Sequence, residues 1–410
     1  MIFGSRLFLR TAAGRVALAV LLLQACVAQA ASVARGLPSG WTELIEQFDE
    51  IVAKDHIVGA SIALVQDGRI VARHDYGFAD LASGRRVDEN TIFHWASITK
   101  TLNAIAVMQL RDRGLLSLQD SVTRYIPELR RVHNPFGSMD DITLAMLLDH
   151  SAGFQAPTWP YKAGKPWEPF EPTRWEQLVA MMPYQEIGFP PGSRFGYSNP
   201  TWIYLARILE ELTGDPWEAY IHKNIFLPLG MQRSYFRSTP YHLKEHRSHN
   251  YSLEYGEGGR LVPKDHGADF DPGITVPNGG WNAPLADVAT YIGFLTGATG
   301  GDAELGRRFE TVLKRSTLEE MWQPRQSIAG ATPSDGISDY MGLAFFIKGS
   351  GAQRVIGHTG GQANFSTMMY FNPLTRRGVV AAFNTSSPPV RDGKPTAFRT
   401  IQKRVIELLQ

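Results

Sequence analysis

The alternation of apolar and polar positions predicts a helix followed by a β-hairpin near the start of the chain. Apolar residues recur at three- and four-residue intervals over 41–52, the spacing of one helix face. Two apolar runs, 61–65 and 70–73, then flank Asp67 and Gly68, a pair that favours a two-residue hairpin turn. We therefore expect an amphipathic helix that lies against a sheet.

The middle of the chain has mostly helical periodicity. Its clearest helix opens at Pro200 and is closed by Gly214, because proline suits the first turn of a helix and glycine the residue after its end. A loop rich in proline and tryptophan covers residues 156–172. Strand-like runs return only late and precede a last helix over 396–410; these runs are 342–348, 354–357, 367–371 and 378–383.

Strands at both ends of the chain with helices between them predict an α+β fold. The two ends are expected to pair into one antiparallel sheet, with helices 41–52 and 396–410 on one face. We expect one catalytic unit with a sheet lobe, about 41–95 and 340–410, and a mostly helical lobe, about 97–325. A functional site is expected between the lobes.

The first thirty residues have the composition of a secretory signal peptide. Arginines precede an apolar run over 16–23 that is too short for a stable membrane span, and small residues up to Ala30 suit cleavage. We therefore expect a periplasmic or secreted protein whose mature part is residues 31–410. The only cysteine, Cys26, leaves a second outcome open, because the residues before it resemble a lipobox, in which the cysteine is lipidated. Gln24 is unusual in that motif, so soluble export is favoured, and a membrane is an expected partner only if Cys26 carries a lipid.

The charge balance, the spacing of the histidines and the absence of certain motifs argue against several classes of function. The chain carries 41 basic and 40 acidic residues, a balance that argues against a nucleic-acid binder. Its eleven histidines show no spacing typical of a metal site, so we expect no metal and no other cofactor. The absence of a Gly-x-Ser-x-Gly elbow and of alternating strands and helices argues against an α/β-hydrolase.

Candidate chemistry begins at Ser97, which precedes Lys100 by three residues at the expected start of a helix. Residues three apart lie on one helix face, so the lysine amine can lie beside the serine hydroxyl. An amine whose pKa is lowered by burial can take the serine proton, and the helix N-terminus offers N–H groups to an oxyanion. Taken alone, the pair also fits an ordinary helix start with the lysine in water.

Two further segments carry polar residues suited to the same cleft. Tyr197 and Asn199, two apart before a predicted helix, can leave an extended stretch on the same side. Alone, they fit a buried aromatic and a helix N-cap equally well. His358, Thr359 and Gly361 end a predicted strand, where glycines let a substrate approach the backbone.

In this order and at these separations, Ser97-Ile98-Thr99-Lys100, Tyr197-Ser198-Asn199 and His358-Thr359-Gly360 resemble the three motifs of the serine β-lactamase and penicillin-binding protein superfamily. The Tyr-x-Asn form resembles the branch of class C β-lactamases, D-Ala-D-Ala carboxypeptidases and esterases. Residues 147–153 and 190–195 are similar to supporting turns of the family, and His150 in the first of them is expected to be structural. The resemblance spans roughly residues 55–405 and implies the β-lactamase/transpeptidase-like fold.

The resemblance implies roles for the residues of the first two motifs. Ser97 would be the acylated nucleophile, and its backbone N–H would form an oxyanion hole together with that of Gly361. Lys100 and Tyr197 would share the proton transfers, with Tyr197 acting as a phenolate or as a relay. Asn199 would hold the amide carbonyl of the substrate.

His358 and Thr359 would line the strand side of the site. Efficient β-lactamases usually have a lysine in place of His358, and its fixed charge attracts the substrate carboxylate. A histidine, with an ordinary pKa near 6.5, is only partly charged at neutral pH. This departure favours an esterase or a D-amino-acid peptidase over a true β-lactamase.

The sequence thus predicts an exported active-site-serine hydrolase that acts through an acyl-enzyme on a small ester, amide or peptide substrate. Two alternatives stay open, a true β-lactamase and a penicillin-binding receptor that is acylated without turnover. The sequence leaves open the oligomeric state and also the pocket shape, which depends on residues 155–175, 235–282 and 325–340.

Overall fold

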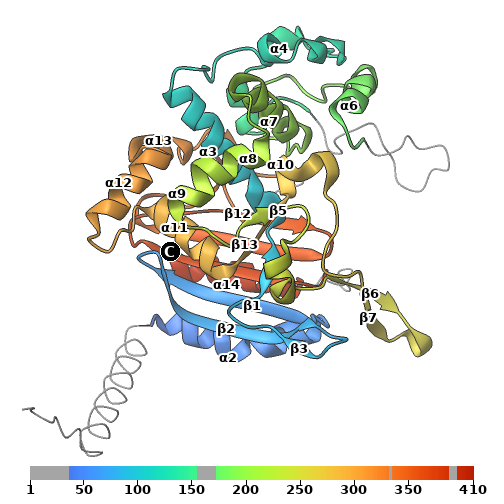
Figure 1. Cartoon of the computed structure of the whole chain (residues 1–410), viewed down its shortest axis with the longest axis vertical. Helices are drawn as coiled ribbons and strands as arrows, with labels where there is room; N and C mark the ends of the chain where they lie inside the picture. The colour runs from blue at the N-terminus through green and yellow to red at the C-terminus, as the bar shows by residue number, and fades with distance from the viewer. Residues whose placement is uncertain (1–36, 155–171, 332–334, 387–394) are drawn as a thin grey trace, which may run out of the picture.

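The computed structural model describes residues 37–154, 172–331, 335–386 and 395–410. The expected signal peptide with Cys26, and nearly all of the loop rich in proline and tryptophan, lie outside the described residues. A nine-stranded sheet lies at the centre, with helices on both faces (Figure 1). Within the described part of the chain, no helix combines the length and the apolar character needed to cross a bilayer.

Both ends of the chain pair into the large sheet, as the sequence predicts. β1 (Gly59–Gln66) pairs antiparallel with β14 (Arg377–Phe383), so that Ala60 lies opposite Phe383. β2 (Arg69–Asp80) returns from β1 through the predicted turn. Asp67 and Gly68 in this turn both have positive φ, 49° and 74°, which is the backbone conformation of a type I′ hairpin.

The sheet runs in the order β3-β2-β1-β14-β13-β12-β11-β10-β9. The remaining strands are β3 (Arg85–Arg86), β9 (Gln326–Ser327), β10 (Tyr340–Met341), β11 (Phe346–Lys348), β12 (Val355–Gln362) and β13 (Phe365–Asn372). Two predicted boundaries were wrong. The run 342–348 forms a strand only at its end, and the strand predicted over 354–357 continues through Gln362. The third motif therefore lies within a strand and not after it.

Two helices from opposite ends of the chain cover one face of the sheet, as predicted. α2 (Ser39–Lys54) and α14 (Ala397–Leu409) pack on each other and on the central strands, and Figure 1 shows α2 beneath the sheet. Along β1, Ile62 and Leu64 join this buried cluster, whereas Ala63 and Val65 join the core on the other side. Alternation of side chains along a strand explains this division.

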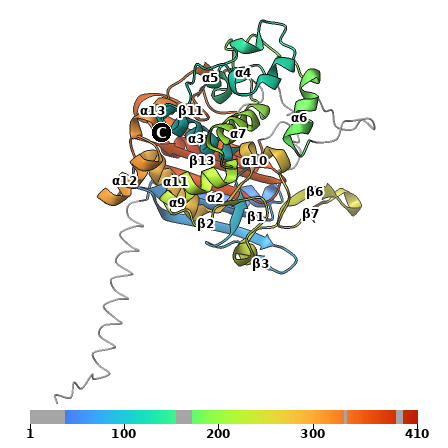
Figure 2. The same ribbon diagram turned by 45° about the horizontal axis from the view of Figure 1, so that its top comes forward.

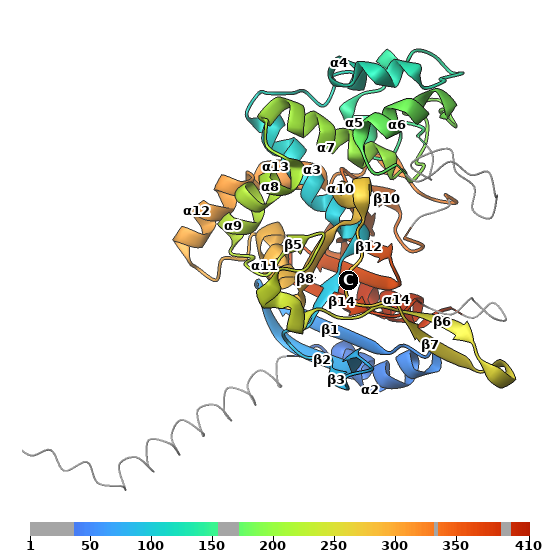
Figure 3. The same cartoon turned by 45° about the vertical axis from the view of Figure 1, so that its right-hand side comes forward.

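The opposite face of the sheet is covered by α11 (Leu285–Thr296). Beyond α11 lies a helical region built around α3 (Thr99–Asp112), and residues 99–110 of α3 are all buried. Figures 2 and 3 show this region from two further directions. Its other helices are α4 (Val122–Tyr125), α5 (Leu144–Leu148), α6 (Trp175–Met181), α7 (Pro200–Thr213), α8 (Trp217–Ile221), α9 (Leu227–Leu229), α10 (Val276–Gly279), α12 (Ala303–Val312) and α13 (Arg315–Met321). The predicted helix from Pro200 to Gly214 is confirmed, and Gly214 has the left-handed φ of 73° that ends many helices.

The prediction that strands return only late was wrong. β5 (Tyr235–Phe236) and β4 (Ile92–His94) flank β8 (Trp281–Pro284) in a small second sheet. β6 (Tyr251–Tyr255) and β7 (Leu261–Asp265) form a hairpin that projects from the body of the protein (Figures 1 and 3). β8 has only four residues and ends in proline, so its sequence has too little periodicity to be recognised as a strand. It nevertheless holds the segment before Ser97 in place, because it pairs with β4.

Candidate active site

Ser97 lies in a tight turn that hydrogen bonds hold in place. Ala96 has a φ of 46°, a left-handed conformation that is uncommon for a residue with a side chain. It begins a short 3₁₀ helix, Ala96–Ile98, that leads into α3. The Trp95 N–H donates to the Trp281 oxygen at 2.7 Å. The Thr99 hydroxyl donates to the Ala96 oxygen at 2.6 Å and accepts from the Trp281 N–H at 3.0 Å. A strained turn held this firmly is common at functional sites.

Lys100 is fully buried, with its amine beside the Ser97 hydroxyl. Its Nζ donates to Ser97 Oγ at 2.9 Å and to the main-chain oxygen of Asn278 at 2.7 Å. Neither of these partners is a carboxylate, and burial lowers the pKa of Lys100 well below that of a free lysine. The alternative of a lysine in water is therefore wrong, and the neutral amine can accept a proton.

Tyr197, from the segment before α7, also lies beside Ser97. Its hydroxyl forms a hydrogen bond with the Ser97 side chain, and its ring centre lies 5.1 Å from the Lys100 amine. Burial raises the pKa of Tyr197, and the bond with Ser97 offsets this only in part. A neutral phenol is therefore favoured over a phenolate.

His150 supports Tyr197 from behind. The two rings are stacked with their centres 4.5 Å apart and an angle of 23° between them. The Ser198 N–H donates to His150 Nδ1 at 3.0 Å, which places the imidazole proton on Nε2. These contacts to a ring and to the backbone fit the structural role expected of His150.

β12 brings the third motif to the same place. β11 pairs with β12 only as far as Gly357, so in the described part of the chain the edge beyond this residue has no neighbouring strand on that side. The Ser97 turn packs on the face of β12 at Gly360. His358, Thr359 and Gly361 thereby reach the pocket next to Ser97.

Gly360 allows β12 to approach the Ser97 turn closely. A Cβ atom there would lie 2.3 Å from the Trp95 oxygen and 2.4 Å from Thr367 Oγ1. We expect Gly360→Ala to lower the free energy of unfolding by roughly 1–3 kcal/mol, as measured in denaturant, because strand and turn must separate. Gly361→Ala is the matched control, since its Cβ would meet nothing within 4 Å. Equal stability of the two variants would contradict this account.

The three motifs line a single cavity of about 310 Å³. Its lining comprises Ser97, Tyr197, Asp335, Phe346, His358, Thr359 and Gly361. The sequence missed Asp335 and Phe346, which belong to no motif. Asn199 does not belong to this lining; it directly precedes α7 with a helical backbone, and its side chain forms no hydrogen bond that caps the helix. Its expected contact with substrate stays a prediction.

Three histidines near the cavity are buried and uncharged. Burial lowers the pKa of His94 to about 4 and that of His358 to about 3, and it lowers the pKa of His150 well below the ordinary value. In the unfolded chain each histidine binds a proton below about pH 6.5, whereas in the folded protein it stays neutral at lower pH.

The free energy of unfolding is therefore expected to fall as the pH drops from about 6.5 towards 4. Each histidine contributes about 1.4 kcal/mol per pH unit in the range where only its unfolded form is protonated. Denaturant titrations at several pH values measure this slope. His358→Asn should reduce it and the exposed His242→Asn should not, whereas stability independent of pH in this range would contradict the prediction.

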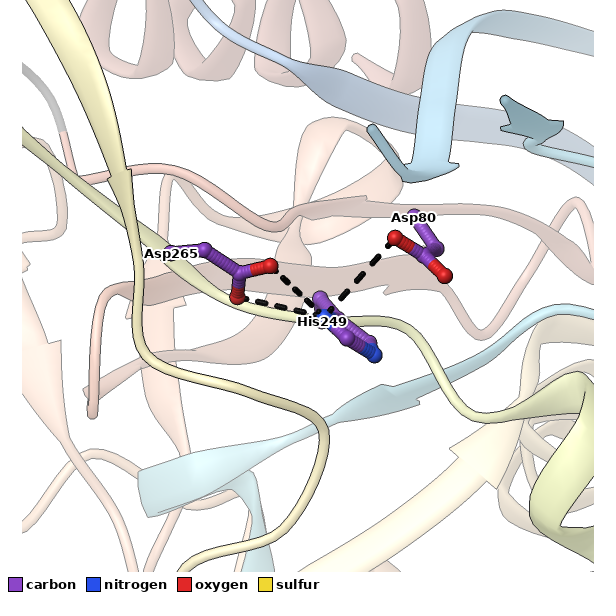
Figure 4. A group of neighbouring side chains, drawn as sticks. All are labelled: Asp80, His249 and Asp265. Carbon is purple, nitrogen blue, oxygen red and sulfur yellow. Dashed lines mark hydrogen bonds and ion pairs between the residues drawn. The ribbon is translucent and has the colours of Figure 1, made fainter. Parts of the chain in front are cut away.

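A second cluster of polar side chains lies at the base of the β6–β7 hairpin. Asp80, His249 and Asp265 point towards one another, with one possible ligand atom of each within 4.8 Å of the others (Figure 4). His249 Nδ1 lies 2.9 Å from Asp265 and 3.9 Å from Asp80. The two carboxylates also accept hydrogen bonds from the Ser83 hydroxyl and the Gly267 N–H. Hydrogen bonds and charge account for the cluster, and we assign no metal to it.

Known proteins resemble the chain over most of its length. Protein flp of Staphylococcus aureus (strain MW2) is 24% identical over 347 residues, which cover 83% of this chain and 63% of flp. Penicillin-binding protein 4* of Bacillus subtilis (strain 168) is 22% identical over 331 residues, which cover 78% of this chain and 66% of that protein. The chain thus spans less than two thirds of the length of these relatives.

Solved structures show the same fold. The octameric penicillin-binding protein homologue from Pyrococcus abyssi has a TM-score of 0.69 at 25% identity and covers 90% of this chain, with 76% of its own chain matched. A D-amino acid amidase from Ochrobactrum anthropi SV3 has a TM-score of 0.69 at 19% identity; the match covers 90% of this chain and 98% of the amidase. A class C β-lactamase has a TM-score of 0.67 at 20% identity; the match covers 90% of this chain and 97% of the β-lactamase. These similarities confirm the predicted α+β, β-lactamase/transpeptidase-like fold.

A family comparison agrees with the motifs and with the fold. The family model described as Beta-lactamase matches residues 43–402, which is most of the chain and includes all three motifs. The cavity formed by the three motifs lies within this matched region. The chain therefore belongs to the beta-lactamase family, within the superfamily of serine β-lactamases and penicillin-binding proteins.

Proposed function

We propose that this protein hydrolyses an ester or amide by transferring its acyl group first to Ser97 and then to water. The observation that carries the proposal is the buried Lys100 amine, which lies 2.9 Å from Ser97 Oγ, and Ser97 lines a cavity that a substrate can enter. Membership of the beta-lactamase family supports it.

In the proposed reaction, Ser97 Oγ attacks the substrate carbonyl carbon and gives its proton to the neutral Lys100 amine. The oxygen of the tetrahedral intermediate is held by the backbone N–H groups of Ser97 and Gly361. The leaving group departs as its bond to the carbonyl carbon breaks, and it receives the proton through Tyr197 as a neutral relay. Water then attacks the acyl carbon and gives a proton to the neutral Lys100 amine. The bond between Ser97 Oγ and the acyl carbon breaks, the acid leaves, and Lys100 returns the proton to Ser97 Oγ.

Within this reaction class we propose an esterase or a D-amino-acid peptidase ahead of a true β-lactamase. His358 takes the place of the usual lysine, and it is buried and uncharged, so it offers no fixed positive charge to a substrate carboxylate. The fold is shared with a D-amino acid amidase, which makes D-amino acid amides sensible first substrates. A receptor that is acylated without turnover is the remaining alternative.

Intact-mass spectrometry with a fluorophosphonate and with a penicillin tests the proposal. We expect one adduct per chain, located on Ser97 by peptide mapping. A short-chain nitrophenyl ester and nitrocefin, assayed side by side, then separate the activities. Fast nitrocefin turnover without esterase activity would favour a β-lactamase, a long-lived penicillin adduct without product would favour a receptor, and no adduct on Ser97 would refute the proposal.

We also propose that the chain is exported, on the basis of its first thirty residues. N-terminal sequencing of protein recovered from the producing cell distinguishes the two outcomes. Cleavage after Ala30 gives a soluble protein, whereas a lipidated Cys26 as the first residue gives a membrane-anchored one. An intact N-terminus on cytoplasmic protein would contradict export.

A further inference from the structure

The cavity beside Ser97 contains an acidic side chain that no motif predicted. Asp335 is 1% exposed and lines the cavity, and neither lysine nor arginine lines it within the described ranges. The carboxylate accepts hydrogen bonds from the hydroxyl groups of Tyr370 at 2.8 Å and Ser338 at 2.6 Å, and from the Ser338 N–H at 2.9 Å. These donors are all neutral, so they hold the carboxylate in place without cancelling its charge.

The negative charge of Asp335 acts on its surroundings. Burial raises the pKa of Tyr370 well above the ordinary value, and the charge of Asp335 raises it further. Arg399 lies close by, but it binds the main-chain oxygen of Asp335 and not the carboxylate. A group that enters the cavity therefore meets a carboxylate whose hydrogen-bond partners carry no opposite charge.

Among the described residues, the strand side of the cavity offers no compensating positive charge. His358 Nδ1 lies 2.5 Å from the Thr359 oxygen, so Nδ1 carries the proton and the oxygen accepts it. A second proton would have to bind Nε2, which is buried and has no hydrogen-bond partner among the described residues. The ring is packed against Phe346, with the ring centres 4.9 Å apart. The position that could supply a cation is thus occupied by a neutral imidazole.

From this arrangement we infer that the site selects substrates whose leaving group lacks a carboxylate, and that it accepts neutral and cationic leaving groups. The inference rests on the proposed serine hydrolase function. A carboxylate would lose water on entry and meet Asp335 in a cavity that no lysine or arginine of the described ranges lines, whereas an ammonium group would meet an opposite charge. This selectivity is opposite to that of a site whose third motif begins with a charged lysine.

Three phenyl esters of one N-acylated glycine test the inference, with a carboxylate, a carboxamide or an aminomethyl group at the same ring position. The rates are corrected for the hydroxide-catalysed hydrolysis of each ester, because the phenols differ as leaving groups. We expect kcat/KM for the neutral and cationic esters to exceed that for the anionic ester by about ten-fold or more. This ratio should change little in high salt, because salt screens buried charges much less than exposed ones. Equal or faster turnover of the anionic ester would overturn the inference.

Variants assign this selectivity to the two side chains. His358→Lys should raise the ratio of anionic to neutral turnover by about ten-fold, and the uncharged His358→Gln should not. Asp335→Asn should raise the ratio of anionic to cationic turnover. Because each readout compares two substrates on one variant, a general loss of activity does not affect it. If a variant fails to fold, the ratios of the wild-type protein still decide.

The two proposals fail in different ways. If Ser97→Ala hydrolyses the three esters as fast as the wild-type protein, the proposed function is wrong, and the inference is wrong with it. If all three esters acylate Ser97 but the anionic ester reacts fastest, only the inference about the leaving group is wrong.

Discussion

Ser97→Ala is expected to lower kcat for a nitrophenyl ester by roughly 10⁴–10⁶, since it removes the atom that would carry the acyl group. The same change should abolish the mass adduct with a fluorophosphonate. The fold should persist, because the Ser97 hydroxyl faces the cavity and the turn is held by backbone and Thr99 contacts.

The control for this variant is Ser198→Ala. Ser198 follows Tyr197 directly and precedes the first residue of α7 by two positions. It is buried, and its hydroxyl has no hydrogen-bond partner in the described part of the chain. The same chemical change is thus made close to the cavity without touching Ser97. Comparable activity of Ser97→Ala and Ser198→Ala would show that another group is the nucleophile.

Lys100→Met should separate activity from stability. We expect kcat to fall by roughly 10²–10⁴, because methionine cannot accept the Ser97 proton. The free energy of unfolding should change little. Removing a buried amine relieves its desolvation, which offsets the lost hydrogen bond to Asn278, and methionine fills a similar volume.

Lys54→Met provides the matched control for Lys100→Met. Lys54 lies on α2, is exposed, and pairs with Glu50 at the surface, so its loss should leave kcat unchanged. Kinetics and denaturant titration of both variants check the prediction. An active Lys100→Met protein would exclude this lysine as the base, and an unfolded one would show that it holds the structure together.

Local signals in the sequence were enough to predict the outer parts of the fold. The Asp67–Gly68 turn, the helix from Pro200 and the two helices over the sheet each depend on contacts close in sequence or on one continuous apolar face. β12 was predicted too short because Gly357, Gly360 and Gly361 weaken a strand signal. These glycines are tolerated because β13 pairs with β12 from Ile356 to Gln362.

The site was predictable where side chains carry the chemistry. Ser97, Lys100 and Tyr197 were found from residue type and spacing, and the structure brings them together. Asn278 could not be found in this way, because it offers Lys100 a main-chain oxygen that every residue possesses. Asp335 was not singled out either: its segment, 325–340, was expected to shape the pocket, but no motif or spacing in it indicates which side chain reaches the cavity.

The pairing of β1 with β14 also determines when the protein can fold during synthesis. Val58, just before β1, bonds to Thr385, which lies 327 positions later, so the central pair of strands waits for almost the whole polypeptide. Contacts between residues so far apart in sequence form slowly. Until β14 has been synthesised and has paired, the edge of β1 that it covers stays open. A product of interrupted translation that lacks β14 would therefore be inactive and prone to aggregate along that edge.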